Sequence, residues 1–167
     1  MKKFFLILAL CALFIFIGCG GSESEESEKN EDCITIDSYT WSPKSSGQIS
    51  WDDAVNFCND LIVCGYSDWH LPTISELRTL IKNCSGTETG GSCGVTNSCL
   101  SSNCWIKSDC TCDYYEDGIY SKFGENDLLW SSSDLSDAID AAWGVYFRHG
   151  YIREFRKTDG LHARCIR

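Results

Sequence analysis

Residues 50–84, SWDDAVNFCNDLIVCGYSDWHLPTISELRTLIKNC, decide the fold of this chain. The first part of the stretch has apolar residues at i, i+3, i+4 and i+7, which predicts an amphipathic helix with one face in a core. Ser50 is a suitable N-cap with Asp53 three residues later, and Gly65 is expected to end the helix. The apolar face of this helix would consist of Trp51, Ala54, Val55, Cys58, Leu61 and Ile62.

A second helix is expected after Pro72, because Thr73 and Glu76 form a capping-box pattern. The turn between the helices, residues 65–72 (GYSDWHLP), carries two large aromatic residues and a proline. That is more apolar bulk than a solvated loop normally has, so we expect the turn to be buried. The apolar stripe of the second helix would consist of Ile74, Leu77 and Ile81.

The chain begins with the layout of an export signal. Two lysines precede an apolar run of 14 residues, which is too short for a membrane span of about 20 residues. The run ends in Phe-Ile-Gly-Cys at residues 16–19, which resembles a bacterial lipobox, although leucine is usual at the first position. We expect residues 1–18 to be removed as a lipoprotein signal peptide and Cys19 to be diacylated. An uncleaved short anchor is the alternative.

Residues 20–32, GGSESEESEKNED, form an expected tether. They have no apolar side chain and a net charge of −5, so they cannot bury enough surface to fold. Fully extended, the tether spans up to roughly 45 Å. Gly20 stands where an aspartate is associated with inner-membrane retention, so the lipobox resemblance implies an outer-membrane anchor more than an inner-membrane one. The rest, residues 33–167, has the length of one domain.

The charge of the mature chain limits its partners. Removal of Lys2 and Lys3 leaves 12 of the 14 basic residues against 24 acidic ones, a net charge of −12. Duplex nucleic acid is therefore not an expected partner.

Cysteine is the strongest compositional feature. Twelve cysteines, less Cys11 in the signal peptide and Cys19, leave ten, an even number in an exported chain. This predicts a disulfide framework. A zinc cluster is the rival interpretation, but the chain has no C-x-x-C pair. The ten are Cys33, Cys58, Cys64, Cys84, Cys93, Cys99, Cys104, Cys110, Cys112 and Cys165.

Six of these cysteines lie within residues 84–112, among Ser, Gly, Thr and Asn. So few apolar residues predict no separate core, and we expect three local disulfides to replace hydrophobic burial there. Six cysteines allow 15 connectivities, which the sequence leaves open. Cys110 and Cys112 are not expected to pair with each other, because a one-residue loop strains disulfide geometry.

Several motifs in fixed order resemble one family. They are GYSDWHLPT at 65–73, a following helix with Glu-Leu, WSSS at 130–133, AWGVYFRHG at 142–150 and RCIR at 164–167. This pattern is similar to the Lcl (Legionella collagen-like protein) C-terminal domain family, also called DUF1566, a relative of the C-type lectin fold. The resemblance implies an α+β domain with two helices packed on a small antiparallel sheet and a disulfide-rich loop region.

The resemblance also implies one disulfide. Lectin-like domains join the first helix to the closing strand, which here would be Cys58 with Cys165. Closing a loop of about 100 residues stabilises a fold by roughly 4 to 5 kcal/mol in the loop-entropy model. By elimination, Cys33 would pair with Cys64. His70 stands where the family usually has arginine, which puts any ion pair of that turn in doubt.

The C-terminal residues alternate in polarity and predict three antiparallel strands, at 143–147, 151–156 and 161–165. Basic residues are concentrated here and interleave with aromatic ones. They could form a cationic strip for sulfated or carboxylated glycans, because guanidinium groups suit such anions. The alternative is that they pair with the domain's own acids on a solvated sheet face. The strip comprises Arg148, Tyr151, Arg153, Arg156, Lys157 and Arg164.

Oxygen-bearing side chains gather between the cysteine-rich segment and the WSSS motif. Such loops suit calcium, so a calcium site is conceivable, with solvated turn carboxylates as the alternative. No other cofactor is expected. The residues are Asp109, Asp113, Glu116, Asp117, Glu125, Asn126 and Asp127.

Catalytic patterns are weak. The three histidines are scattered, and no G-x-S-x-G motif surrounds the serines at 131–133. We therefore expect no enzyme but a binding or adhesion domain of an envelope lipoprotein, as one branch of the resembled family suggests. Its partners would be a membrane through the lipid and an anionic glycan or a surface protein. The alternatives are an envelope structural or assembly protein and, more distantly, an enzyme related to the formylglycine-generating fold, which uses reactive cysteines.

Overall fold

The computed structural model of this chain describes residues 33–113 and 118–167. The predicted signal peptide, the lipidation of Cys19 and the acidic tether lie outside the described residues. The longest helix in the described part has nine residues, and none is long and apolar enough to cross a membrane.

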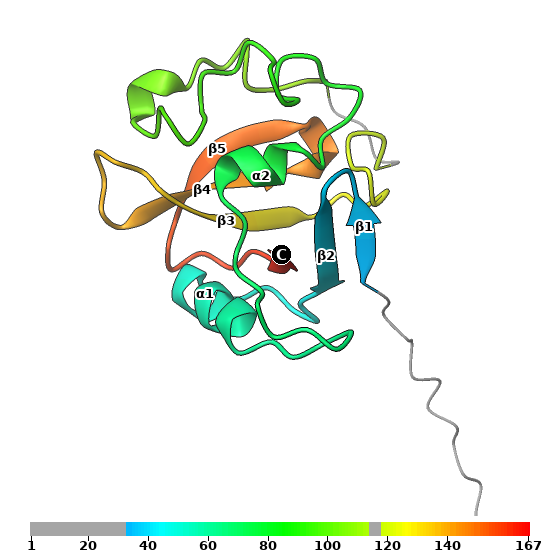
Figure 1. Cartoon of the computed structure of the whole chain (residues 1–167). Coiled ribbons are helices and arrows are strands. Elements are labelled where there is room, and N and C mark those ends of the chain that lie inside the picture. The colour runs from blue at the N-terminus through cyan, green and yellow to red at the C-terminus, as the bar shows by residue number, and fades with distance from the viewer. Residues whose placement is uncertain (1–32, 114–117) are drawn as a thin grey trace, which may run out of the picture. The chain divides into compact units, whose positions relative to one another are not determined.

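The described residues form two helices and two three-stranded antiparallel sheets, which confirms the α+β class (Figure 1). The single small sheet of the prediction is in fact two. One sheet has the strand order β1-β2-β6 and the other β3-β4-β5. The elements are β1 (Ile34–Ile36), β2 (Tyr39–Lys44), α1 (Trp51–Asn59), α2 (Ile74–Arg78), η1 (Ser102–Cys104), β3 (Leu128–Asp134), β4 (Ala141–Tyr146), η2 (Phe147–His149), β5 (Tyr151–Arg156) and β6 (Arg164–Ile166).

The predicted C-terminal meander is only partly correct. β4 and β5 pair as expected, but their sheet is completed by β3, which contains the WSSS motif. The last strand, β6, pairs instead with β2 near the start of the domain. Alternation predicts which side chains of a strand share a face but does not identify its partner strand, because the partner is set by the path of the chain.

Both helix N-termini follow the sequence prediction. The Ser50 side chain accepts the Asp53 N–H, and Thr73 and Glu76 form the full capping box. Both helices are shorter than predicted. α1 is capped by Asp60 and does not reach Gly65, and Ile62, assigned above to the buried face, is 79% exposed.

Only the second half of the turn at residues 65–72 is mostly buried. Trp69, Leu71 and Pro72 are buried, as predicted, whereas residues 65–68 are exposed, contrary to the prediction. The His70 N–H and C=O bridge to Ile166 of β6. The buried half of the turn therefore fastens the region between the helices to the closing strand.

The β3-β4-β5 sheet has a core on each face. On one face Trp143, Val145 and Ile152 pack with α2 residues such as Leu77. On the other, Trp130 and Ala142 pack with Ala54 and Cys58 of α1. Trp143, Val145, Leu77 and Trp130 are fully buried. The sheet is thus the central layer between the two helices.

Five disulfides connect the ten cysteines of the described part. Cys33–Cys64 and Cys58–Cys165 are the two pairs that were expected from the sequence. The six clustered cysteines, whose connectivity was open, form three local bridges, Cys84–Cys112, Cys93–Cys110 and Cys99–Cys104. Such a framework indicates an oxidising compartment outside the cytoplasm.

The cysteine-rich segment, defined here as residues 84–112, does more than cross-link itself. Cys84, Cys93 and Cys110 are almost fully buried and belong to the core cluster that contains Trp143. The segment has no separate core, as predicted, but most of its cysteines join the main one. Its sulfur atoms fill space that aliphatic side chains would otherwise occupy.

One buried cation holds the cysteine-rich segment in place. Arg78 of α2 is 2% exposed and donates to the backbone carbonyls of Thr87, Glu88, Cys93 and Val95 at 2.7–3.0 Å. Burial lowers the pKa of Arg78, but an arginine remains charged in proteins. Sequence reasoning did not single out Arg78, because its position at the end of a helix resembles an ordinary solvated one.

Candidate functional site

The candidate site lies on β5, the edge strand of the β3-β4-β5 sheet. In an antiparallel edge strand, alternate residues turn their backbone groups away from the sheet. On β5 these residues are Ile152, Glu154 and Arg156, because Ile152 bonds to groups outside the sheet. What covers these groups determines whether another strand can add to the edge.

The two ends of the β5 edge are covered. The Ile152 N–H donates to Cys110 O at 3.0 Å, and Trp105 Nε1 donates to Ile152 O at 2.6 Å. At the other end, the Arg156 N–H donates to Asp159 Oδ2 at 3.0 Å. The green loops beside β5 in Figure 1 belong to the cysteine-rich segment that supplies the first cover. Strand addition along this edge is therefore blocked, and β5 offers its side chains instead.

Arg153 is the central side chain of the exposed part of β5. It lies opposite Gly144 of β4 and between Tyr151 and Phe155 on the same face of the strand. Its Cζ atom is 5.7 Å from the centroid of the Tyr151 ring and 5.2 Å from that of Phe155. Gly144 leaves room for this arrangement, since an added Cβ there would be 3.1 Å from the Phe155 ring. The guanidinium is exposed and held by two aromatic rings.

Arg156 extends the site along the strand. Together with Arg153 it lines a shallow depression of about 370 Å³, whose other walls are Ala141, Glu154, Phe155 and Asp159. Asp159 is part of the wall, but one of its carboxylate oxygens accepts the Arg156 N–H. The depression therefore combines two guanidinium groups, an aromatic ring and carboxylates.

Neither arginine is neutralised by a neighbour. Within residues 33–113 and 118–167, no carboxylate lies within 4.0 Å of the side-chain nitrogens of Arg153 or Arg156. The only side-chain hydrogen bond of Arg153 in this part of the chain goes to the backbone carbonyl of Glu154, at 3.2 Å. An arginine side chain has five N–H donors, so four of those of Arg153 remain available to an anion.

The other members of the predicted cationic strip are used differently. Lys157 Nζ is 2.7 Å from Asp134 and lies over the Trp51 ring at 4.1 Å. Arg164 bonds to Ser42 O and to Glu125 and lies over the Phe123 ring at 4.1 Å. For these two residues the structure matches the alternative interpretation, pairing with the domain's own acids.

The remaining two members are Arg148, which precedes β5, and Tyr151, the first residue of β5. Arg148 belongs to η2, with its guanidinium 6.0 Å from the Tyr146 ring. Tyr151 is half-buried beside Trp105, at a ring distance of 6.0 Å, and this burial raises its pKa. The structure thus brings Tyr151, Arg153 and Arg156 together on β5 and places Lys157 and Arg164 in ion pairs.

The candidate calcium residues do not form a cluster in the described part of the chain. Glu125 and Asp127 bind Lys44, and Glu125 also binds Arg164. No group of three His, Cys, Asp or Glu side chains suited to a metal ion occurs among the described residues. Glu116 and Asp117 lie outside them.

One Ser-His-Asp arrangement occurs in the described residues. Ser45 Oγ is 3.4 Å from His162 Nδ1, and His162 Nε2 is 3.9 Å from Asp127. Ser45 is buried, donates to Gly47 O and accepts the Ala163 N–H, so its hydroxyl is committed to the backbone. A nucleophile must be exposed to substrate and hydrogen-bonded to its base. Ser45 instead holds the residue before β6 through the Ala163 N–H, and its buried hydroxyl is not exposed to a substrate.

The family motifs meet in a contact that sequence reasoning missed. Arg167 donates to both carboxylate oxygens of Asp68, at 2.7 and 3.2 Å, and its guanidinium lies 3.6 Å from the centroid of the Tyr66 ring. The hydrogen bond from Arg167 lowers the pKa of Asp68. The half-exposed His70 is 3.7 Å from Glu76. The available indication was the opposite charge of Asp68 in GYSDWH and Arg167 in RCIR.

Comparison with known proteins gives a family. A model of the Lcl C-terminal domain matches residues 31–167, which is most of the chain. The chain belongs to the Lcl C-terminal domain family. No curated protein matches the chain. In this Lcl C-terminal domain the family motifs at 65–73 and 164–167 are in direct contact, through Asp68 and Arg167 and through the His70–Ile166 bridge.

Proposed function

We propose that this protein is an exported lipoprotein, lipidated at Cys19, whose Lcl C-terminal domain binds polyanionic glycans without catalysis. Membership of the family and five disulfides support a domain that acts outside the cytoplasm. The sequence at residues 16–19 supports the lipid anchor, with the outer membrane as the expected location. The domain would then act in the cell envelope or on the cell surface.

The observation that carries the binding role is the pair of exposed, unneutralised guanidinium groups on β5. Arg153 and Arg156 stand in a domain rich in acids, yet no described carboxylate pairs with them. Guanidinium forks bind sulfate and carboxylate groups with two parallel hydrogen bonds. The Tyr151 and Phe155 rings that flank Arg153 provide flat apolar surface of the kind on which sugar rings stack.

The form of the site favours a repeating, flexible ligand. The depression is shallow, so it does not enclose a small molecule as a typical ligand pocket does. The blocked backbone edge also disfavours a peptide that adds as a strand. A sulfated or uronic-acid polysaccharide can contact both arginines along one strand while leaving most of its length in solvent.

A glycan array repeated over a salt series tests this role. We expect sulfated or carboxylated glycans to bind at low ionic strength and to bind progressively less as salt screens the contact. Arg153→Ala and Arg156→Ala should each weaken binding by about tenfold, the effect of losing one charge-assisted hydrogen bond. Lys82→Ala is the matched control, because Lys82 lines a different depression and its loss changes the net charge equally.

A further variant separates charge from stacking. Arg153→Lys keeps the positive charge but removes the planar fork that lies between the Tyr151 and Phe155 rings. We expect it to bind more weakly than the native protein and more strongly than Arg153→Ala. Absence of glycan binding at low salt would instead favour an envelope structural or assembly protein.

A further inference from the structure

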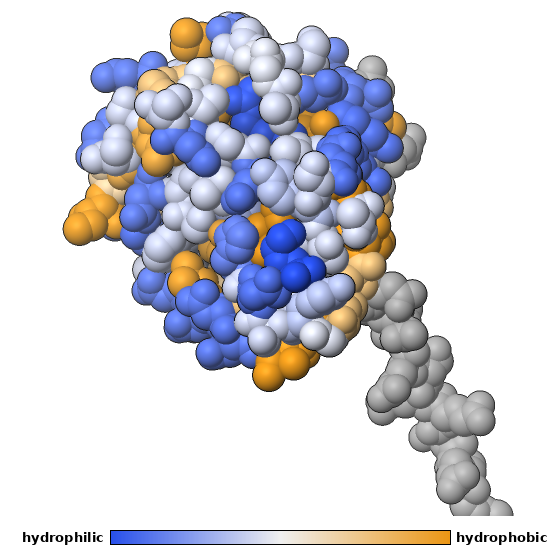
Figure 2. Space-filling model, viewed as in Figure 1, coloured by the Kyte–Doolittle hydropathy of each residue, from blue (hydrophilic) through white to orange (hydrophobic). Residues whose placement is uncertain are grey.

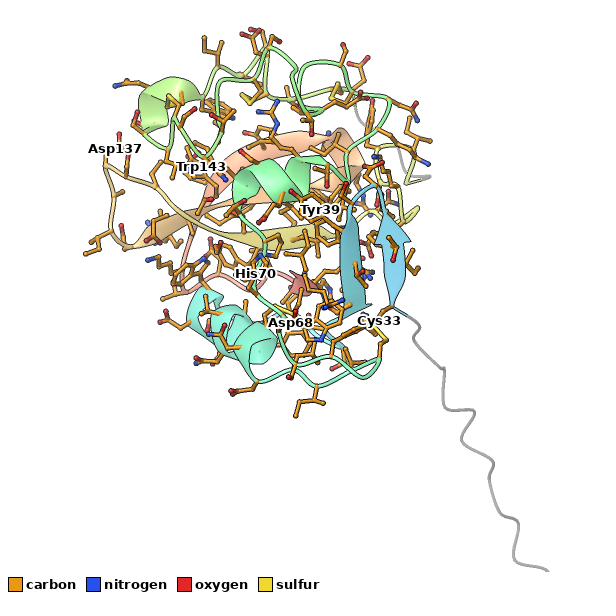
Figure 3. The ribbon with its side chains drawn as sticks, in the orientation of Figure 1. Cys33, Tyr39, Asp68, His70, Asp137 and Trp143 are labelled. Carbon is orange, nitrogen blue, oxygen red and sulfur yellow. A yellow bond between two sulfur atoms is a disulfide. The ribbon has the colours of Figure 1, made fainter. Side chains whose placement is uncertain are left out.

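A small apolar patch surrounds the Cys33–Cys64 disulfide. Its members, Ile34, Ile62 and Tyr66, are 46%, 79% and 42% exposed. The disulfide joins the residue before β1 to the turn that follows α1, and Cys33 N donates to Cys64 Sγ at 3.2 Å. We call this surface the apolar patch. Figure 2 shows hydrophobic surface along the lower edge and lower right of the domain, and Figure 3 places Cys33 and Asp68 on that side.

The turn that presents Ile62 and Tyr66 is firmly held. Val63 and Tyr66 exchange backbone hydrogen bonds at 3.1 and 2.9 Å. Cys64 adopts a left-handed conformation, with φ 54°, which an L side chain adopts rarely. Arg167 lies against the Tyr66 ring at 3.6 Å. Ile62 is therefore exposed by a structured turn and not by the fraying of a helix end.

The apolar patch adjoins the point where the tether enters the domain. Residue 33, in the disulfide, directly follows the 13 residues between the proposed lipidated Cys19 and the domain. Thirteen residues reach at most roughly 45 Å when fully extended. The surface around Cys33 is thus the part of the domain that is connected to Cys19 by the shortest length of chain. Tethering also makes contact with the bilayer an intramolecular event, so a small apolar patch is sufficient.

We infer that the domain docks on the membrane through this apolar patch, with the headgroup and acyl boundary of the bilayer as the occupant. This inference rests on the proposed lipid anchor. Ile62 would enter the boundary, and Tyr66 has the amphipathic ring that suits it. Arg167, the cation beside the patch, is neutralised by Asp68, and the tether carries six acids. A zwitterionic surface therefore fits better than an anionic one.

Docking also orients the domain. The connection between β3 and β4, which contains Asp137, lies on the opposite side from Cys33 and Asp68 (Figure 3). Ile139 in that connection is 92% exposed but has no such relation to the tether. It serves as a matched control, because its replacement removes the same side chain from another part of the surface.

The test uses the full mature lipidated protein on phosphatidylcholine vesicles, with the same chain carrying Cys19→Ser as the soluble reference. Hydrogen exchange is measured for the backbone amides of β1 and of residues 61–67. We expect exchange at least about threefold slower on vesicles than in the reference. Ile62→Ser should abolish the protection of β1, which is remote in sequence from the substitution, whereas Ile139→Ser should retain it.

Two results would overturn the docking. One is equal exchange of these amides on vesicles and in the reference, with intact mass showing the lipid on Cys19. The other is protection in the lipid-free reference that grows with protein concentration, which would make a second copy of the chain the occupant. A mature protein that carries no lipid would refute the proposed anchor itself, and intact mass distinguishes that failure from a failure of docking.

Discussion

The cysteine-rich segment and the β3-β4-β5 sheet belong to one core but are ordered by different means. The sheet orders its backbone by strand pairing and by burying large side chains such as Trp130 and Trp143. The cysteine-rich segment has one short 3-10 helix and no strand, and depends on three disulfides and on Arg78. A sequence poor in apolar residues can thus still be fixed closely enough to cover a sheet edge.

The largest effect is expected on the helix and sheet side, from the pair Cys58→Ala and Cys165→Ala. This disulfide spans 107 residues and is fully buried. Its removal should lower the free energy of unfolding by about 4 to 5 kcal/mol in the loop-entropy model. Denaturant unfolding followed by tryptophan fluorescence measures this, and a loss below that of a local disulfide would show that loop length does not govern stability here.

Arg78→Met is expected to be next and to act on the cysteine-rich segment. It leaves three buried backbone carbonyls and one part-buried one without the donor they have in the native protein. We expect a loss of about 3 kcal/mol in the free energy of unfolding. Faster hydrogen exchange should be confined to residues 84–112 and to Ile152, which that segment covers.

Arg78→Lys is the matched control for that variant. A lysine keeps the charge but cannot reach four carbonyls with the spread of a guanidinium. We expect an intermediate stability. Equal stability of the lysine variant and the native protein would mean that charge alone, and not the geometry of the donors, orders the segment.

A smaller effect is expected from the pair Cys99→Ser and Cys104→Ser. The two cysteines are only five residues apart in sequence, so the loop-entropy model gives a loss of about 2 kcal/mol in the free energy of unfolding. The change should remain local to η1, because Cys99 is exposed and the other two bridges of the segment are intact. Thermal unfolding compared with the Cys58 and Cys165 variant measures the contrast, and an equal loss would contradict it.

The smallest effect is expected from Asp68→Asn, at the exposed contact with Arg167. Because the hydrogen bond from Arg167 lowers the pKa of Asp68, the native pair contributes stability above the ordinary carboxyl pKa. That contribution is lost as pH falls through the lower, folded-state pKa. The melting temperatures of the two proteins should therefore differ slightly at pH 7 and converge in acid. A difference that persists in acid would show that the ion pair is not its source.

Local features were predictable from the sequence, whereas most non-local ones were not; the Cys58–Cys165 pair was expected only through the family resemblance. Ser50 and Thr73 begin their helices as predicted, because capping depends on residues within one turn. The end of α1 was predicted too late, since Leu61 and Ile62 continue the helical pattern although Cys64 must leave the helix to reach Cys33. The partner of β6 and the pairing of the six clustered cysteines depend on the path of the whole chain.

The site shows the same division. The basic and aromatic alternation of β5 identified Tyr151, Arg153 and Arg156. It did not show that Lys157 and Arg164 would be paired with Asp134 and Glu125, because these acids are distant in sequence. Nor did it show that the cysteine-rich segment covers the backbone of Ile152, which leaves the side chains of β5 as the accessible feature.

The central claim is that ten cysteines build the scaffold of an exported, lipid-anchored binding domain. The most direct test is the intact mass of the native mature protein, measured before and after alkylation, with and without reduction. The account predicts no alkylation without reduction, ten alkylated cysteines after it, and the mass of a diacylglycerol and an acyl chain on a protein that begins at Cys19. Most thiols reacting before reduction, or a stoichiometric zinc ion in the native protein, would contradict it.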